Sequence, residues 1–163
     1  MTYGCFGTLG RPIRSTAYYY YKHLDVPSTP SGDLRCILVV DDNADNAWAL
    51  AVLLRLEGHT VHTGGDGREA VALALRLSPT IIFMDLGMPV LDGFEAARQI
   101  RMQPEGKSIF LCAISAYGTT ETRVRATEAG FDRYLQKPAN FDEIMSILTD
   151  YDNTAAPRRT PNE

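Results

Sequence analysis

Four short apolar runs in this chain each end in a polar residue, and this pattern constrains its fold more than any other feature. The runs cover residues 36–40, 81–84, 109–114 and 134–136, and they lead into Asp41–Asp42, Asp85, Ser115 and Lys137. If the runs are parallel strands of one sheet, these polar residues meet at its carboxyl edge, where open α/β sheets bind ligands. The sequence therefore predicts a site that gathers three carboxylates, one hydroxyl and one ammonium group.

Segments with helical character separate these runs. In segment 44–57, Ala47, Leu50, Ala51 and Leu54 recur at helical spacing. Two later segments open with capping boxes, Asp66 with Glu69 and Asn140 with Glu143. The expected strands are 36–40, 59–63, 80–84, 108–114 and 133–136, and the expected helices are 44–57, 66–77, 93–102, 119–129 and 140–151. Alternation of apolar strands with helices predicts an α/β fold, a doubly wound parallel sheet covered on both faces.

The chain divides into one domain and two flanking segments. Residues 1–34 are rich in glycine and proline without a sustained period, which predicts a poorly ordered N-terminal extension. Its run Tyr18–Tyr21 leaves a docking role open as the alternative. Residues 35–151 contain every expected strand and helix and form the predicted domain. Residues 152–163 are expected to be a disordered tail.

Composition limits the partners and the compartment. The net charge is −4 and no basic stripe is present, which argues against direct nucleic-acid binding. No apolar stretch approaches the ~20 residues of a membrane helix, and the start of the chain does not have the pattern of a secretory signal. Cys36 and Cys112 lie in apolar runs without C-x-x-C spacing, so buried reduced thiols are expected. Together these features predict a cytoplasmic protein.

The three aspartates at the predicted edge favour a metal site. Carboxylates placed close together repel each other unless a cation lies among them. Mg²⁺ takes oxygen ligands and keeps several waters, so Asp41, Asp42 and Asp85 with the backbone carbonyl of Gly87 are the expected ligands. The alternative is that Asp41 and Asp42 only cap the helix that begins at Ala44. A cap explains one aspartate but not all three.

Asp85 also has the chemistry of a phosphoacceptor. Attack of a carboxylate on a phosphoryl group gives an acyl phosphate, and catalysis then consists mainly of positioning and charge neutralisation. Lys137 is expected to neutralise the phosphoryl group opposite the metal, and Pro138 restricts the lysine backbone to an extended form. Ser115 is expected to donate its hydroxyl to a phosphoryl oxygen, although a serine after a strand is by itself more often a turn residue.

The motifs that carry these residues resemble the receiver domain of two-component response regulators. They are Val39–Asn43, Met84–Gly93, Ala113–Ala116 and Lys137–Pro138, and the resemblance covers about residues 35–151. It implies a flavodoxin-like five-stranded sheet of order 2-1-3-4-5. It also implies that Asp85 takes a phosphoryl group from a phosphohistidine, that Asp41 and Asp42 hold Mg²⁺, and that Ser115 and Lys137 contact the phosphoryl group. Tyr134 matches the aromatic switch position of the family.

The resemblance implies a signalling phosphoacceptor rather than an enzyme. Its partners would be a histidine kinase or histidine phosphotransfer domain and one downstream protein, and a homodimer is left open. The domain could stand alone or be excised from a hybrid kinase. Gly87 and Tyr117 flank the path of an attacking water, so the phosphate lifetime is not predicted.

Two alternatives are retained. The first is an interaction module that keeps the fold but works without phosphorylation, which the presence of all four reactive residues disfavours. The second is an aspartate-nucleophile phosphatase. Such an enzyme needs a second acid two residues after its nucleophile, and Gly87 occupies that position here.

Overall fold

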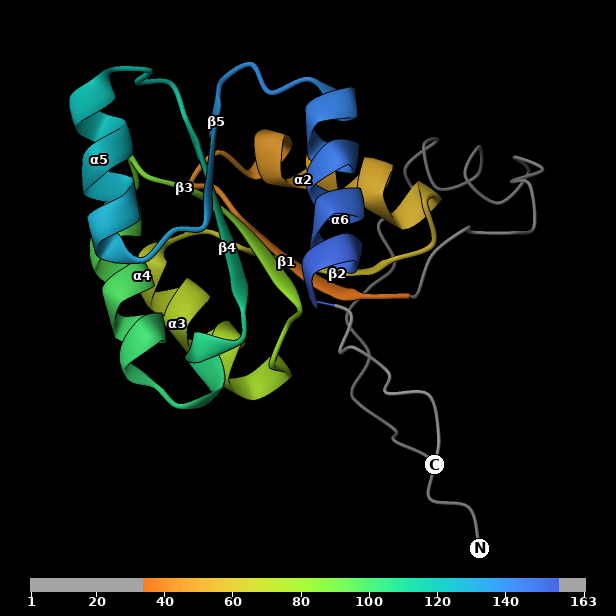
Figure 1. Ribbon diagram of the computed structural model, residues 1–163, viewed down its shortest axis with the longest axis horizontal. Coiled ribbons are helices and arrows are strands. Elements are labelled where there is room, and N and C mark those ends of the chain that lie inside the picture. The colour runs from red at the N-terminus through yellow and green to blue at the C-terminus, as the bar shows by residue number, and fades with distance from the viewer. Residues whose placement is uncertain (1–33, 156–163) are drawn as a thin grey trace, which may run out of the picture.

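The computed structural model describes residues 34–155 and forms an alternating series of strands and helices (Figure 1). The strands are β1 (Cys36–Val40), β2 (Thr60–Gly64), β3 (Ile81–Asp85), β4 (Phe110–Ser115) and β5 (Arg133–Gln136). The helices are α2 (Ala44–Leu56), α3 (Gly67–Leu77), α4 (Gly93–Met102), α5 (Thr120–Ala129) and α6 (Phe141–Ala155), with a short 3₁₀ turn η1 (Glu105–Lys107). Within the described residues no helix is long and apolar enough to span a membrane.

All strand pairs are parallel, and the sheet order is β2-β1-β3-β4-β5. This confirms the doubly wound topology predicted from the sequence. Figure 1 shows α3, α4 and α5 on one face of the sheet and α2 and α6 on the other. We call these the α3–α5 face and the α2–α6 face.

Two hydrophobic cores lie on the two faces of the sheet, because successive strand residues point to opposite sides. On β3, Ile82 and Met84 pack into the cluster under α3, α4 and α5, whereas Ile81 and Phe83 pack into the cluster under α2 and α6. Every residue of β3 is buried. Burial on both faces explains why the strand sequences are nearly continuous apolar runs.

The observed boundaries differ from the predicted ones in informative places. Strands β3 and β4 continue through Asp85 and Ser115, so both polar residues belong to their strands. The turn η1 was not predicted, and α6 runs beyond Tyr151 to Ala155. The N-terminal extension and the tail fall outside the described residues, except for their inner ends at Leu34 and 152–155.

Helix α2 is capped by Asn43. Its Oδ1 accepts hydrogen bonds from the N–H groups of Asp45 at 2.9 Å and Asn46 at 3.3 Å. The alternative that Asp41 and Asp42 serve only as caps is therefore wrong. Both carboxylates are left for the edge of the sheet.

The two predicted capping boxes are present. Asn140 and Glu143 exchange hydrogen bonds in both directions, at 2.8 and 3.2 Å. Asp66 accepts from the Glu69 N–H at 2.8 Å, and the Glu69 carboxylate accepts from the Gly65 N–H rather than from that of the cap itself. These bonds satisfy N–H groups that the first turn of a helix leaves without partners.

The described thiols are free, and Cys112 is fully buried. Burial raises the pKa of Cys112 to about 12; the charge of Arg133 lowers this pKa and that of Asp132 raises it, both by smaller amounts. Cys36 is only partly buried, and desolvation raises its pKa as well. A thiol is reactive as its thiolate, so neither residue has the character of a nucleophile.

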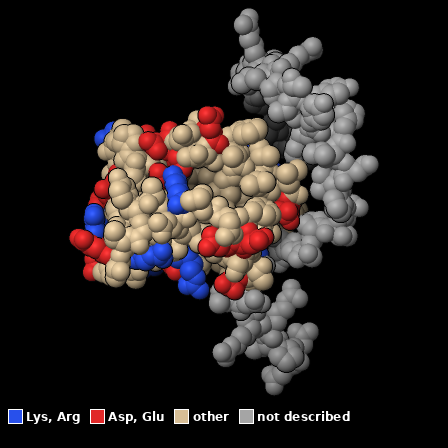
Figure 2. All heavy atoms as spheres, turned by 90° about the horizontal axis from the view of Figure 1, so that it is seen from above, with Lys and Arg blue, Asp and Glu red and all other residues tan. Residues whose placement is uncertain are grey.

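The surface seen from above carries acidic and basic side chains, several of them next to one another (Figure 2). Large areas between them are neither acidic nor basic, and no continuous basic stripe crosses the described part of this face. The view agrees with the net negative charge of the sequence.

Candidate phosphoacceptor and metal site

Three carboxylates meet at the carboxyl edge of the sheet, as the sequence predicts. Asp41 follows β1 directly, and Asp85 ends the neighbouring strand β3. Oxygens of Asp41, Asp42 and Asp85 lie within 4.8 Å of one another. Asp41 and Asp85 are nearly buried, at 7% and 9% exposure, whereas Asp42 is exposed.

Lys137 places its ammonium group between two of these carboxylates. Its Nζ lies 2.8 Å from Asp41 Oδ2 and 3.1 Å from Asp85 Oδ2. The lysine follows β5, and its backbone N–H donates to the Ser115 carbonyl at 2.8 Å. In the sheet order, β4 lies between Lys137 and Asp85, and both β4 and β3 lie between Lys137 and Asp41, so the side chain reaches along the edge across two strands.

The surroundings of Lys137 keep it charged. Partial burial lowers the lysine pKa, but the hydrogen bonds and charges of Asp41 and Asp85 raise it more, so the net pKa shift is upward. A lysine with a raised pKa remains an ammonium ion at neutral pH. The site therefore offers a fixed positive charge within contact of Asp85.

Backbone amides fix the orientation of both buried carboxylates. Asp85 Oδ1 accepts from the N–H of Leu86 at 2.7 Å and from that of Gly87 at 3.4 Å. Asp41 Oδ1 accepts from the Asn43 N–H at 2.9 Å. Each acid thus has one oxygen held by the chain, while the other faces Lys137.

The donor set fits a hard divalent cation. Three carboxylates face one ammonium group in a partly buried edge, so negative charge is in excess there. Mg²⁺ prefers oxygen ligands and needs few of them from the protein, because it retains waters. Asp41, Asp42 and Asp85 are the residues that would hold it. The Gly87 carbonyl, expected as a further ligand, stays a prediction.

Ser115 lies in β4, one position beyond Ile114, which pairs with Asp85. It is almost fully buried, and its Oγ accepts from the Tyr117 N–H at 3.2 Å. Strand alternation directs the Asp85 and Ser115 side chains to opposite faces of the sheet. Asp85 follows Phe83 on the α2–α6 face, whereas Ser115 follows Ala113 on the α3–α5 face. The predicted contact between the Ser115 hydroxyl and a phosphoryl group therefore stays a prediction.

Tyr134 lies on the same face as Ser115. It pairs with Ala113 in the sheet and packs against the α3–α5 cluster. The Arg123 guanidinium stacks over its ring at 4.6 Å. The Tyr134 hydroxyl is buried and has no hydrogen-bond partner among the described residues. Its role as a switch stays a prediction.

A groove beside the carboxylates was not predicted. It has a volume of about 480 Å³, lies between α2 and α6, and includes Asp41, Asp85 and Lys137 in its lining. The rest of the lining is mainly apolar, with Val39, Val40, Ala49, Leu50, Leu53, Phe83, Ile114, Pro138, Ala139, Phe141 and Ile144, together with Asn46. The signal available in the sequence was the composition of segment 44–56, which is apolar except for Asp45, Asn46 and Arg55.

The sheet order, together with an aspartate at the end of β3 that contacts a lysine and lies among further carboxylates, defines the class of receiver domains. The chain belongs to the response regulator receiver domain family, whose model matches residues 37–149. This confirms the resemblance inferred from the motifs and places the protein among the receivers of two-component systems.

Related proteins in the curated collections are similar over most of this domain. An uncharacterised 14.6 kDa protein of Leptolyngbya boryana is 36% identical over 115 residues, which are 71% of this chain and 88% of that protein. The transcriptional regulatory protein PrrA of Mycobacterium leprae is 38% identical over 110 residues, which are 68% of this chain and 46% of PrrA. The chain thus matches less than half the length of that regulator.

Solved structures show the same fold. The receiver domain of a sensor histidine kinase of Pseudomonas aeruginosa, which has magnesium in its active-site cleft, is 35% identical with a TM-score of 0.69. The match covers 74% of this chain and 99% of that domain. The receiver domain of Ssk1 of Saccharomyces cerevisiae, solved with the histidine phosphotransfer protein Ypd1, is 28% identical with a TM-score of 0.72. That match covers 78% and 94% of the two chains.

Proposed function

We propose that this domain accepts a phosphoryl group on Asp85 from the phosphohistidine of a partner protein, with Mg²⁺ held by Asp41, Asp42 and Asp85. The observation that carries the proposal is the position of Lys137, whose Nζ contacts Asp85 at 3.1 Å at the edge where three carboxylates meet. This arrangement supplies a nucleophile and positive charge at one place, which is what phosphoryl transfer requires.

The residues have distinct tasks in the transfer. A carboxylate oxygen of Asp85 attacks phosphorus, the P–N bond to the donor imidazole breaks, and the ring nitrogen keeps the electron pair and takes up a proton. Lys137 balances the negative charge of the transferred oxygens, and the Leu86 and Gly87 amides hold the carboxylate in place. Bound Mg²⁺ would supply further charge neutralisation at the phosphoryl oxygens.

Comparison with relatives supports the choice of metal and partner. A similar receiver domain has magnesium in its active-site cleft, and another was solved with a histidine phosphotransfer protein. We infer a histidine kinase or histidine phosphotransfer domain as the donor, one downstream protein as the target, and a cytoplasmic location.

We further propose that phosphorylation shifts the α3–α5 face between two existing states. Ser115 and Tyr134 share this face, and the Tyr134 hydroxyl is buried without a hydrogen-bond partner among the described residues. A rearrangement that draws the Ser115 hydroxyl toward the phosphoryl group would free space for the Tyr134 ring. Residues 35–151 are the proposed functional unit, acting as a phosphoacceptor rather than as an enzyme on free substrates.

Incubation with acetyl phosphate and Mg²⁺ tests the proposal. Intact-mass spectrometry should show a gain of one phosphoryl group in the wild-type protein and none in Asp85→Asn, because the amide is a poor nucleophile. Removal of Mg²⁺ with EDTA should abolish the gain as well. Asp92→Asn is the matched control, since Asp92 only caps α4, and it should be phosphorylated like the wild type.

Other outcomes would favour the alternatives. A wild-type protein that never gains mass would be a phosphorylation-independent interaction module. Repeated turnover of free phosphomonoesters would instead indicate a phosphatase.

A further inference from the structure

Helix α5 is held on the domain by few apolar side chains. Of its ten residues, only Ala126 and Ala129 are buried, and Val124 is 51% exposed. A surface helix normally packs a continuous apolar stripe on the core, and two alanines bury little apolar area. Contacts of another kind therefore contribute to the position of α5 beside α4 and β5.

Two arginines of α5 make such contacts. The guanidinium carbon of Arg123 lies 4.6 Å from the centroid of the Tyr134 ring in β5. That of Arg125 lies 4.4 Å from the centroid of the Phe94 ring in α4. Residues two positions apart in an α-helix point to nearly opposite sides of it. Helix α5 is thus held by one cation–π contact with β5 and another with α4.

The ring of Tyr134 is the sole side-chain partner of the Arg123 guanidinium within residues 34–155. The guanidinium forms no ion pair and no hydrogen bond with these residues, although it carries five N–H donors. Arg101 in α4 differs, since its guanidinium is fully engaged by carbonyls and a carboxylate. The contact of Arg123 can therefore break without leaving another group of the described chain unpaired.

The position of the Tyr134 ring results from opposed contributions. Its hydroxyl is buried and has no hydrogen-bond partner among the described residues, and a buried hydroxyl without a partner is unfavourable. The Arg123 cation over the ring is favourable. A ring with this balance can change position when one contribution is removed.

Ser115 indicates which arrangement of the α3–α5 face the stacked ring belongs to. The Ser115 Oγ accepts from the Tyr117 N–H, and its side chain takes the face opposite to that of Asp85. Under the proposed function, contact with a phosphoryl group on Asp85 requires the Ser115 hydroxyl to move from this position toward the edge of the sheet. Arg123 stacks on Tyr134 before that movement, so the stacking favours the starting arrangement.

We propose that Arg123 is a positioning residue that holds the Tyr134 ring in place and thereby opposes the rearrangement driven by a phosphoryl group on Asp85. This inference rests on the proposed function, because it names a regulator of that same site. Loss of the stacking shifts the equilibrium toward the rearranged state. By linkage, the affinity of the site for a phosphoryl group rises as the equilibrium shifts.

The affinity of the protein for beryllofluoride, a stable analogue of a phosphoryl group, measures this equilibrium in the presence of Mg²⁺. Arg123 is exposed, and Arg123→Gln removes its cation. The affinity should rise about two- to five-fold, the range that an exposed cation–π contact accounts for. Loss of a positive charge by itself weakens the binding of an anion, so a rise cannot come from the charge alone. Arg123→Lys keeps a cation and should restore most of the wild-type value.

Arg125→Gln is the matched control. It removes the same charge from the same helix, but the Arg125 cation lies over Phe94 rather than over Tyr134. Its affinity for beryllofluoride should not rise. In the Tyr134→Leu background, Arg123→Gln should have no effect on the affinity, because the ring on which the cation acts is absent. If Arg123→Gln does not fold by circular dichroism, Arg123→Met replaces it and should give the same rise.

Fluorine NMR of fluorotyrosine-labelled protein separates positioning from a merely structural role. The chain has eight tyrosines, and the Tyr134 signal is the one that Tyr134→Leu removes. In Arg123→Gln without beryllofluoride, this signal should lie closer than in the wild type to the position that the wild type shows with beryllofluoride. A structural role alone would lower the melting temperature without this displacement.

Several results would overturn the role of Arg123. An unchanged or lower affinity in Arg123→Gln would do so, as would an equal rise in Arg125→Gln. A rise that persists in the Tyr134→Leu background would show that the ring is not involved. A wild type that neither binds beryllofluoride nor is labelled by acetyl phosphate would contradict the proposed function itself, which is a separate result.

Discussion

At the scale of single residues, Val90 has an unfavourable backbone conformation. Its φ of 70° lies in the left-handed region, which a β-branched side chain rarely adopts. The Leu91 N–H donates across it to the Pro89 carbonyl at 2.8 Å, which forms a tight three-residue turn. The side chain is 70% exposed, so packing does not compensate for the strain. The turn belongs to the loop that follows Asp85.

Val90→Asn should stabilise the protein by about 1 kcal/mol. Asparagine tolerates the left-handed region, and such strain costs on the order of 1–3 kcal/mol in other residues. The free energy of unfolding from urea titration is the measurement. Val124→Asn is the matched control, because Val124 is also exposed but lies in helix α5. It should change the free energy by less than about 0.5 kcal/mol, and an equal gain in both variants would show that relief of strain is not the cause.

The proximity of Asp41 and Asp85 was predicted correctly from the sequence. Asp41 and Asp85 follow adjacent strands, so their proximity depends only on sheet order. The position of Ser115 relative to them was harder to predict, because it depends on which face each side chain takes. That in turn depends on whether the strand ends before or after the polar residue, and strand ends are the least certain part of such predictions.

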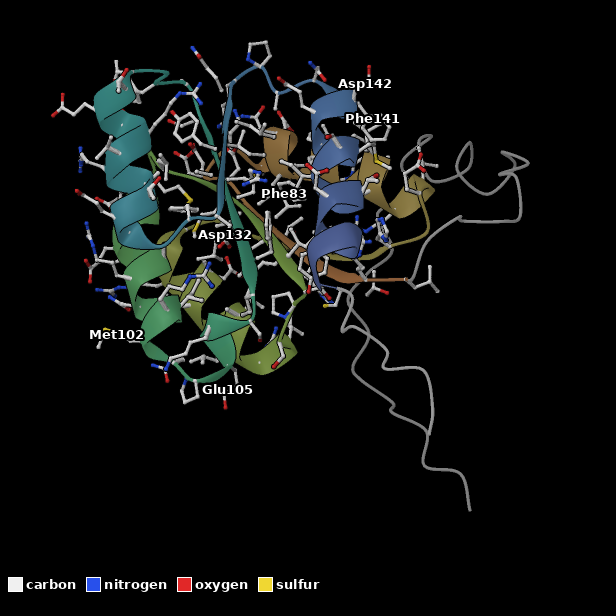
Figure 3. All side chains as sticks on the ribbon, in the orientation of Figure 1. Phe83, Met102, Glu105, Asp132, Phe141 and Asp142 are labelled. Atoms are coloured by element: carbon white, nitrogen blue, oxygen red, sulfur yellow. The ribbon has the colours of Figure 1, made fainter. Side chains whose placement is uncertain are left out.

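At the scale of elements, Arg101 joins four parts of the chain. From the last turn of α4, its guanidinium donates to the carbonyls of Gly106, Ile109 and Gly130 at 2.6–2.8 Å. It also forms an ion pair with Asp132 at 2.7 Å. The Asp132 carboxylate accepts in addition from the N–H of Leu111 in β4. Figure 3 shows Asp132 between α4 and the sheet.

Arg101→Met should destabilise the protein by about 2–4 kcal/mol. The change keeps most of the side-chain volume but leaves partly buried carbonyls and a carboxylate without their donor, and such unpaired groups cost about 1–3 kcal/mol each. Chemical denaturation provides the measurement. Arg98→Met on the same helix is the control. Its ion pair with Glu95 is half exposed, so the loss should stay below about 1 kcal/mol. Equal losses would mean that the network around Arg101 contributes little.

The sequence predicted the elements through their periodicity and caps, but not the contacts between them. Helix 93–102 and strand 133–136 match the observed α4 and β5. The Arg101 network and the α2–α6 groove were not predicted, because they join residues far apart in the chain. Whether such residues come into contact depends on how the helices pack against the sheet and against each other, which the local sequence pattern does not determine.

At the scale of the whole molecule, stability and metal binding should be linked. A ligand that binds only the folded state stabilises it by RT ln(1 + [L]/Kd). The three carboxylates come together only when β1 and β3 pair, so the unfolded chain does not offer this site. The topology itself was predictable, because strand and helix alternate along the sequence.

Mg²⁺ should therefore raise the melting temperature of the wild type, with a gain of about 2.7 kcal/mol at 100 times Kd. Asp42→Asn should lose most of this gain, because it removes one of the three carboxylates, and the side chain it changes is exposed. Differential scanning fluorimetry over a MgCl₂ series provides the measurement, with NaCl at equal ionic strength to separate binding from screening. Equal stabilisation by NaCl, or in Asp42→Asn, would contradict a specific metal site.

The alternation of side chains along the strands has a consequence for how such a domain can diverge. Asp41, Asp85 and Lys137 open toward α2 and α6, whereas Ser115 and Tyr134 lie toward α3–α5. A buried sheet separates the two sets. Under the proposed function, the phosphoryl group arrives at the first set and the response involves the second, so a substitution near one set can leave the other unchanged. A duplicated gene could thus acquire a new stimulus and retain its old response.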